Sequence, residues 1–379
     1  MRRRGLTRPG CAGANWSFSS ARERLEADAF YADLMGVPLR RRAPWEGESE
    51  PPPVALPAGF RIGAWLDVGG RSLADNGTAH VDALRAMGIS DACIMVNDFS
   101  TSSFGFGVVS PERVTVFAGL LRGSGINLTL TSWLRPSRPF IDAMLRDLPP
   151  LAQTVGATAI ELDVEERWTR ASPAGFATHD EAAEYLFAGL RRAAVREAAV
   201  NCQVDQIGGP RMRAIVQLAD VVIPQAYSTP GHAIGSPYGP RGLQRRAAQH
   251  VASAAPGKPI IMGLAAWRLE SWPGHSPREI MTIDLQETIR LAGENAIRGA
   301  RYWSWKHLVG IDARGGRPAK SYGRPFLEQI ARSRVAGQPA VVAQPPVVAG
   351  PPAIAQPLVQ PPAVAAPIRA EDLPWAQSR

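Results

Sequence analysis

Apolar runs of strand length alternate with longer amphipathic stretches between residues 58 and 335. Alternation of short β-rich runs with helical stretches is typical of repeated βα units and predicts a parallel sheet. Eight such units follow one another within the length usual for one α/β barrel, so the sequence predicts a single (β/α)8 TIM barrel. The expected strands cover residues 59–66, 91–97, 126–133, 157–164, 198–204, 219–226, 258–265 and 299–305.

Two helix starts between these strands are well marked. Ser110 precedes Pro111, and Ser276 precedes Pro277. A serine at the N-cap satisfies a free backbone N–H group of the first turn, and proline suits the first helical position because the N–H it lacks would have no partner there. Both helices are therefore expected to begin at the proline.

Compositional bias sets both ends of the chain apart from the barrel. Residues 1–57 are basic and rich in Gly and Ser and end in prolines, which is typical of a mostly disordered extension, with one short helix expected within 20–36. Residues 336–379 are rich in Pro, Ala and Val, and their Pro-Pro pairs favour a disordered polyproline II spacer that cannot build a core. The charged end of this tail, 368–375, is either a docking peptide for a partner or a chain end without a binding role.

The charge balance and the aromatic content favour particular partners. The formal net charge is +8 and the pI is near 9.9, which favours an anionic partner such as a cell-wall polymer or a nucleic acid. Basic motifs interleaved with aromatics are missing, so no nucleic-acid partner is predicted. Ten tryptophans favour a site that stacks flat, weakly charged ligands. A basic arm explains much of the charge equally well, since several arginines precede the barrel: Arg2, Arg3, Arg4, Arg8, Arg40, Arg41 and Arg42.

The sequence lacks motifs for metal or nucleotide chemistry. Cys11, Cys93 and Cys202 have neither disulfide nor zinc spacing, and the last two are expected to be small core residues. The six histidines do not pair at ligand spacing. GxxxxGK[ST] is absent, and the nearest approaches to GxGxxG, from Gly105 and Gly123, lack the third glycine. We therefore predict no cofactor and no metal, with Mg²⁺ or Ca²⁺ held by strand-end carboxylates as the weaker alternative.

Membrane and secretion signals are also missing from the pattern. No apolar run approaches the roughly 20 residues that cross a bilayer. The charged start at 1–4 is not followed by the apolar segment of a secretory signal peptide. The sequence predicts no membrane association and a cytoplasmic location, or release by a non-classical route, and it gives no signal for an oligomeric state.

Acidic residues occupy alternate positions of the expected strand at 157–164 and follow its end. Glu161, Asp163 and Glu165 share one face, because alternate side chains of a strand point the same way. Unpaired buried carboxylates are costly or shift their pKa. A working site is the simplest reason for three of them, and an ion-pair network with Arg135 or Arg167 is the structural alternative.

Polar and aromatic residues stand at the ends of the other expected strands. In (β/α)8 barrels the chemistry is found at the carboxyl ends of the strands. Carboxylates, amides and aromatic rings suit a carbohydrate, because sugar hydroxyls need paired donors and acceptors while their C–H faces stack on rings. Packing of the tryptophans and loop capping by the aspartates are the alternatives. The candidates are Trp65, Asp67, Asn97, Asp98, Trp133, Asp205, Gln225, Tyr227, Trp267 and Trp303.

Three segments resemble family 18 glycoside hydrolases, the chitinases and related endo-N-acetylglucosaminidases. Residues 156–165 resemble the family's fourth-strand motif, DxxDxDxE, but diverge at two of the four acids: Asp163 and Glu165 match, whereas Glu161 and Thr158 replace aspartates. Residues 223–227 resemble its Met/Gln-x-Tyr segment, and 299–304 resemble its last strand, which ends in Trp. The order of the motifs agrees over about 58–330.

The resemblance implies a hydrolase of a polymer that contains N-acetylglucosamine, either chitin-like or peptidoglycan. Glu165 would protonate the glycosidic oxygen, and Asp163, with Glu161 behind it, would orient the substrate acetamide, whose carbonyl oxygen attacks the anomeric carbon. Tyr227 would hydrogen-bond that acetamide, and Trp303 would form the floor beneath the sugar.

Other functions stay open. A lysozyme-like cell-wall hydrolase would pair Glu165 with a second carboxylate across the barrel end, at Asp67, Asp98 or Asp205. A glycan-binding barrel would keep the aromatic side chains without catalysis. A scaffold displayed through the proline-rich tail would need no site in the barrel.

Overall fold

The computed structural model describes residues 54–309, except 229, 231, 268, 270, 271, 273 and 274, and residues 323–337. Nearly all of the two predicted extensions, with the expected helix at 20–36 and Cys11, lies outside the described residues. No helix in the described part of the chain is long and apolar enough to cross a membrane.

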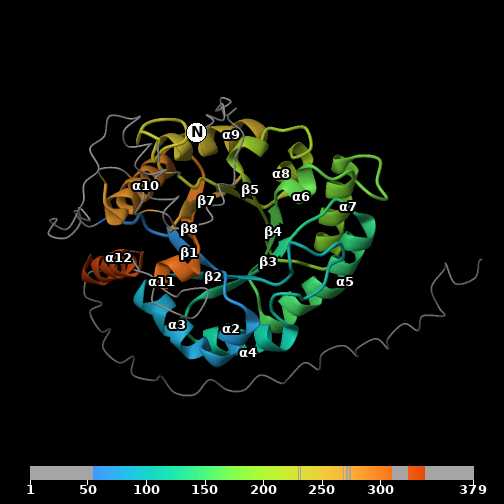
Figure 1. Ribbon diagram of the computed structural model, residues 1–379, viewed down its shortest axis with the longest axis horizontal. Coiled ribbons are helices and arrows are strands. Elements are labelled where there is room, and N and C mark those ends of the chain that lie inside the picture. The colour runs from blue at the N-terminus through green and yellow to red at the C-terminus, as the bar shows by residue number, and fades with distance from the viewer. Residues whose placement is uncertain are drawn as a thin grey trace, which may run out of the picture. The chain divides into compact units, whose positions relative to one another are not determined.

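Eight parallel strands form a closed barrel in sequence order, with β1 hydrogen-bonded to β8 (Figure 1). The predicted (β/α)8 barrel is confirmed. The largest difference is at the last strand, which begins and ends two residues before the expected 299–305. The strands are β1 (Arg61–Leu66), β2 (Asp91–Met95), β3 (Asn127–Trp133), β4 (Ala159–Val164), β5 (Ala198–Gln203), β6 (Val221–Gln225), β7 (Ile260–Ala265) and β8 (Ile297–Trp303).

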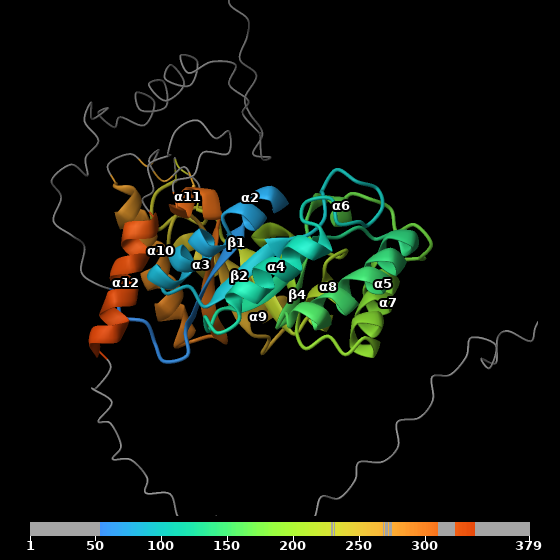
Figure 2. The same cartoon turned by 90° about the horizontal axis from the view of Figure 1, so that it is seen from below.

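Helices surround the barrel, and three short ones, α2, α6 and α11, follow the carboxyl ends of β1, β4 and β8. Figure 2 shows these three at the same end of the barrel. The helices are α2 (Gly70–Asp75), α3 (Gly77–Ala86), α4 (Pro111–Leu121), α5 (Arg138–Val155), α6 (Glu166–Thr169), α7 (His179–Arg192), the 3-10 turn η1 (Val204–Gln206), α8 (Arg213–Leu218), α9 (Gly242–Ala254), α10 (Pro277–Ala292), α11 (Trp305–Val309) and α12 (Gly323–Gly337).

Both predicted helix starts are confirmed. α4 begins at Pro111 and α10 at Pro277. The Ser276 hydroxyl accepts a hydrogen bond from the backbone N–H of Glu279 at 3.2 Å, as an N-cap serine should. Ser110 stands at the N-cap of α4 without that bond.

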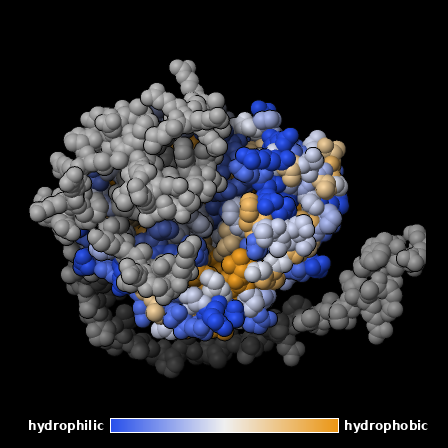
Figure 3. All heavy atoms as spheres, in the orientation of Figure 1, coloured by the Kyte–Doolittle hydropathy of each residue, from blue (hydrophilic) through white to orange (hydrophobic). Residues whose placement is uncertain are grey.

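The apolar core has two layers, as a barrel requires. A large cluster fills the space between the barrel and its helices, and a small one lies inside the barrel around Trp65, Cys93 and Ile223. Cys93 and Cys202 are both buried with free thiols, as the sequence predicts. In Figure 3 the coloured surface is mixed, with an apolar patch on the side of α2 and α4.

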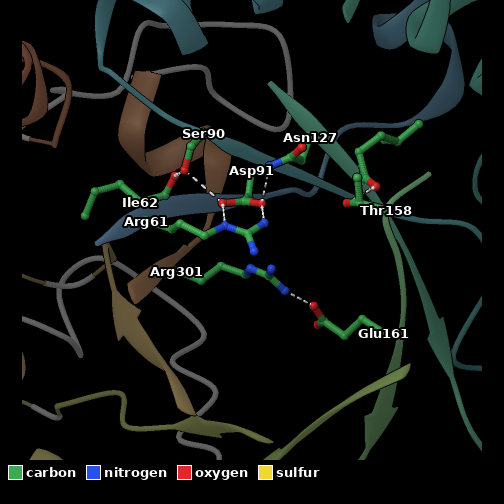
Figure 4. A network of polar contacts seen from close by, with 9 residues as sticks. Arg61, Ile62, Ser90, Asp91, Asn127, Thr158, Glu161 and Arg301 are labelled. Atoms are coloured by element: carbon green, nitrogen blue, oxygen red, sulfur yellow. Dashed lines mark hydrogen bonds and ion pairs between the residues drawn. The ribbon is translucent and has the colours of Figure 1, made fainter. Parts of the chain in front are cut away.

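Charged residues close the amino-terminal end of the barrel. The Arg61 guanidinium donates to Asp91 from Nε at 2.8 Å, and both residues stand at the start of their strands. Ser90 and Asn127 donate to the same carboxylate, at 2.8 and 3.3 Å (Figure 4). With its lone pairs occupied on several sides, the Asp91 carboxylate is fixed in position at the base of the barrel.

Candidate active site at the carboxyl end of the barrel

Two carboxylic acids lie side by side at the end of β4. Asp163 is the last but one residue of the strand, and Glu165 directly follows it. The side-chain amide of Gln225, at the end of β6, donates to both: to Glu165 Oε1 at 2.6 Å and to Asp163 Oδ1 at 3.4 Å. Asp163 and Glu165 are alternate residues at the end of β4, and the side chain of Gln225 is long enough to reach both. The structure thus brings together three residues that the sequence predicts to belong to the site.

Both acids hold a proton more tightly than free carboxyl groups. Burial raises the pKa of Asp163 well above its usual range, and the nearby charges of Glu165 and Glu161 raise it further. Burial also raises the pKa of Glu165, and this outweighs the Gln225 hydrogen bond, which favours the ionised form. Neither acid has an ion-pair partner in the part of the chain that the structure describes. The pair is therefore able to hold and release a proton.

A cluster of aromatic rings lies at the same end of the barrel. Tyr227 contacts Trp65 and Trp267 edge to face, with ring centroids 6.4 and 4.9 Å apart, and Trp65 contacts Trp303 at 6.1 Å. Burial raises the pKa of Tyr227 well above its usual range, and the negative charges of Asp163 and Glu165 add to the shift, so its hydroxyl stays protonated. These four predicted residues therefore form one aromatic wall: Trp65 and Trp303 belong to β1 and β8, and Tyr227 and Trp267 lie two residues beyond β6 and β7. Tyr227 lies close enough to both acids for their charges to act on its hydroxyl.

Glu161 lies deeper in the barrel and is held by an ion pair. Its carboxylate has no exposed surface and pairs with Arg301 of β8 on the opposite side of the barrel (Figure 4). The Trp65 indole N–H donates to the same carboxylate at 2.6 Å, and Asn201 of β5 donates to it at 3.0 Å. The partner is thus Arg301 and not the expected Arg135 or Arg167. A carboxylate held on three sides is fixed in position, and its charge is one of those that raise the pKa of Asp163.

Three predicted aspartates do not join this group. Asp98 is exposed and accepts hydrogen bonds from the backbone N–H and the hydroxyl of Ser100, at 2.7 and 2.8 Å, as a loop-capping residue does. Asp205 is exposed and forms an ion pair with Arg246. Asp67 accepts from the backbone N–H of Lys306 at 3.1 Å and fixes the start of α11.

Asn97 and Trp133 shape the neighbouring edge of the barrel. Asn97 is fully buried and exchanges two hydrogen bonds with the backbone of Trp133, at 2.8 and 3.0 Å. It therefore ties the segment after β2 to the end of β3 and is not available to a ligand. Trp133 is in register with Asp163 and is partly exposed.

Sequence reasoning missed two buried polar residues inside the barrel, Arg301 and Asn201. Arg301 is 3% exposed although it carries a charge. Its position two residues before Trp303 places it on the same face as a predicted site residue, and that alternation was the available signal. Gly63 makes room for it, since a Cβ there would lie 3.1 Å from Arg301 Nε and 3.3 Å from Asp91 Cβ.

Other features of the described residues lie away from the acids. A cavity of about 260 Å³ is lined by residues of α9 and α10, and one of about 280 Å³ by residues around the start of β4 and the end of α5. Neither includes Asp163, Glu165 or the aromatic wall. Among the described residues no group of three or more His, Cys, Asp or Glu side chains is placed to hold a metal ion.

Comparison with known proteins identifies the fold but no sequence family. Neither family models nor curated protein sequences gave a match. A GH113 β-1,4-mannanase matches with a TM-score of 0.52 at 11% identity, covering 74% of this chain and 100% of its own. The AHE enzyme of Alicyclobacillus herbarius (0.55, 12%) and the β-glycosidase BGL167 (0.53, 12%) each cover 76% of this chain and 99% of their own.

Similar solved structures thus include glycoside hydrolases with TIM barrels, at low identity. A GH18 chitinase from Pseudoalteromonas aurantia also matches, with a TM-score of 0.49 at 11% identity over 72% of this chain and 99% of its own. Because a GH113 mannanase and a β-glycosidase have the same fold, the comparison does not single out family 18.

Proposed function

We propose that this barrel is a glycoside hydrolase acting on a polysaccharide that contains N-acetylglucosamine, with Glu165 as the general acid. The observation that carries the proposal is the Asp163–Gln225–Glu165 group at the carboxyl end of the barrel. Active sites of (β/α)8 enzymes occur at this end, and the aromatic wall beside the acids suits the C–H faces of a sugar.

Glu165 is the better proton donor of the two acids. It stands just beyond the strand and is partly exposed, whereas Asp163 is 5% exposed. A general acid works best with a pKa near the working pH, and burial moves the pKa of Glu165 in that direction. A bound sugar would exclude more water and raise it further, so protonation of the glycosidic oxygen by Glu165 fits the geometry.

Asp163 and Tyr227 suit the acetamide group of the substrate. In substrate-assisted hydrolysis the acetamide carbonyl oxygen attacks the anomeric carbon, so no enzyme nucleophile is needed. The acetamide N–H then gains positive character, which an adjacent carboxylate stabilises. In the reactive form the coupled pair holds one proton, on Glu165, so that Asp163 is ionised; Glu165 gives this proton to the leaving oxygen while the Asp163 carboxylate stabilises the positive acetamide. Tyr227, which stays protonated, can donate to the acetamide oxygen.

A two-carboxylate mechanism has less support. It needs a second acid across the site to act as nucleophile or base. The candidates for that role are engaged elsewhere: Asp67 with Lys306, Asp98 with Ser100 and Asp205 with Arg246. Asp163 is the carboxyl group that faces Glu165, and its burial favours positioning over attack.

The test is an incubation of the full chain with chitooligosaccharides and with peptidoglycan strands, followed by mass analysis of the products. We expect cleavage next to an N-acetylglucosamine residue. Glu165→Gln keeps the size of the side chain and its contact with Gln225, and should abolish turnover while preserving binding. Binding without turnover in the wild type would instead identify a glycan-binding barrel, and neither binding nor turnover would refute the proposal.

A further inference from the structure

Two arginines converge on one phenylalanine at the edge of the candidate site. The Arg167 guanidinium lies over the Phe99 ring, 4.3 Å from its centroid. Arg135 donates to the backbone oxygen of Phe99 at 3.3 Å. The Phe99 ring in turn contacts Trp133, with centroids 4.6 Å apart. The contacts place two cations and two aromatic rings in one cluster, the Phe99 cluster.

Neither arginine has an acidic partner among the residues that the structure describes. Other arginines in the same region do: Arg170 pairs with Glu166 at 2.8 Å, and Arg246 pairs with Asp205. Burial lowers the pKa of Arg135, and the positive charge of Arg167 lowers it further, so the two guanidiniums repel each other. Like charges brought together without an anion are unfavourable, and a bound anion would relieve the repulsion.

The Phe99 cluster adjoins the two acids along the chain and across the sheet. Trp133 is in register with Asp163, and the next residue, Leu134, donates its backbone N–H to the Asp163 backbone oxygen at 3.1 Å. Arg167 lies two residues after Glu165. A polysaccharide with one sugar at the acids would therefore reach the cluster with a neighbouring sugar.

We propose that Arg135 and Arg167 bind a carboxylate on the sugar next to the cleaved bond, so that the substrate is an acidic glycan containing N-acetylglucosamine. This inference rests on the proposed function and specifies its substrate class. Guanidinium groups bind carboxylates through paired charge-assisted hydrogen bonds, and the partly exposed ring of Trp133 offers an apolar surface beside them for a sugar ring.

Two kinds of sugar supply this chemistry, the lactyl carboxylate of N-acetylmuramic acid and the carboxylate of a uronic acid. The experiment therefore uses three sets of oligosaccharides: peptide-free peptidoglycan strands, hyaluronan oligosaccharides and neutral chitooligosaccharides. We expect the wild-type kcat/KM to be higher on one acidic set than on the neutral set, and to fall with rising salt on that set alone. The set that is preferred identifies the source of the carboxylate.

The variants are Arg135→Gln, Arg167→Gln and the double variant, with Arg170→Gln as the matched control. Arg170 is exposed and already paired with Glu166. The double variant should lose about 10- to 100-fold in kcat/KM on the preferred acidic set, mainly through KM, the scale expected for losing hydrogen bonds to a charged group. On chitooligosaccharides it should stay within about twofold of the wild type. Arg167→Lys should recover part of the loss, and Arg170→Gln should have no effect.

The results separate this inference from the proposed function. If the double variant loses activity equally on neutral and acidic sets, or on neither, the carboxylate site is refuted while the hydrolase stands. If no set of oligosaccharides is cleaved, the proposed hydrolase activity is refuted. Calorimetric measurement of the binding of the same sets then still tests the carboxylate site. Tighter binding of an acidic set that the double variant abolishes supports it, and equal binding of all three sets overturns it.

Discussion

The ion pair between Arg301 and Glu161 makes a prediction about stability. Arg301→Met removes the cation and leaves the carboxylate in the barrel with two neutral donors, at 2.6 and 3.0 Å. The two side chains are 3% and 0% exposed. Removing one partner of a buried pair costs about 3–5 kcal/mol because the other charge stays buried and unpaired. The two remaining hydrogen bonds favour the lower end of that range.

The measurement is urea denaturation of the wild type and the variant, with the free energy of unfolding extrapolated to water. For a domain of this size, about 3 kcal/mol corresponds to a fall in Tm of roughly 10 °C. Glu161→Leu combined with Arg301→Met should be less destabilised than Arg301→Met alone, because no charge is then left behind. The exposed Arg170 serves as the control, and Arg170→Met should leave stability unchanged. A loss below about 1 kcal/mol for Arg301→Met, or strictly additive effects in the double variant, would refute the buried pair.

Three further changes test other parts of the structure. Burial raises the pKa of Asp284 to about 7, so its contribution to stability is lost as the pH rises from about 4, the unfolded pKa, to about 7. In urea denaturation, Asp284→Asn should therefore flatten the fall of the unfolding free energy with pH in this range, and an unchanged pH dependence would contradict the prediction. Gln225→Leu removes the hydrogen bond that lowers the pKa of Glu165, so the alkaline limb of the profile of kcat/KM against pH should move to higher pH. A shift to lower pH would exclude Glu165 as the general acid. Gly63→Ala places a Cβ 3.1 Å from a buried guanidinium and should cost about 1–3 kcal/mol by denaturation, while Gly69→Ala, with nothing within 4 Å, should cost clearly less.

The fold was predictable because the signals that specify it are local. Most strands of the barrel are short runs rich in apolar residues, and the helix starts at Pro111 and Pro277 are marked by their own residues. Pairing of consecutive strands then follows from the chain order. The grouping of Asp163, Glu165 and Gln225 was predictable for the same reason, since each stands at a strand end and barrel closure brings those ends together.

The partners of the site residues were less predictable because they come from distant parts of the chain. Glu161 and Arg301 are 140 positions apart and meet only because β4 and β8 lie on opposite sides of the same interior. Asp98 failed to reach the site for a local reason, since β2 ends at Met95 and the loop turns the side chain outward. A strand-end aspartate and a loop-capping aspartate look alike in sequence, and only the position of the last paired residue separates them.

The acids inside the barrel have different partners at its base, in its middle and at its carboxyl end. At the base Asp91 pairs with Arg61, and in the middle Glu161 pairs with Arg301, so each acid has a cation of its own. At the carboxyl end Asp163 and Glu165 share one neutral amide, and no cation pairs with either acid among the described residues. Burial therefore raises the pKa of Asp163 and Glu165, and the charge of Glu161 adds to the shift at Asp163. Because Arg301 pairs with Glu161, Asp163 and Glu165 are left without a cation among the described residues, at the end of the barrel where we propose that a polysaccharide binds.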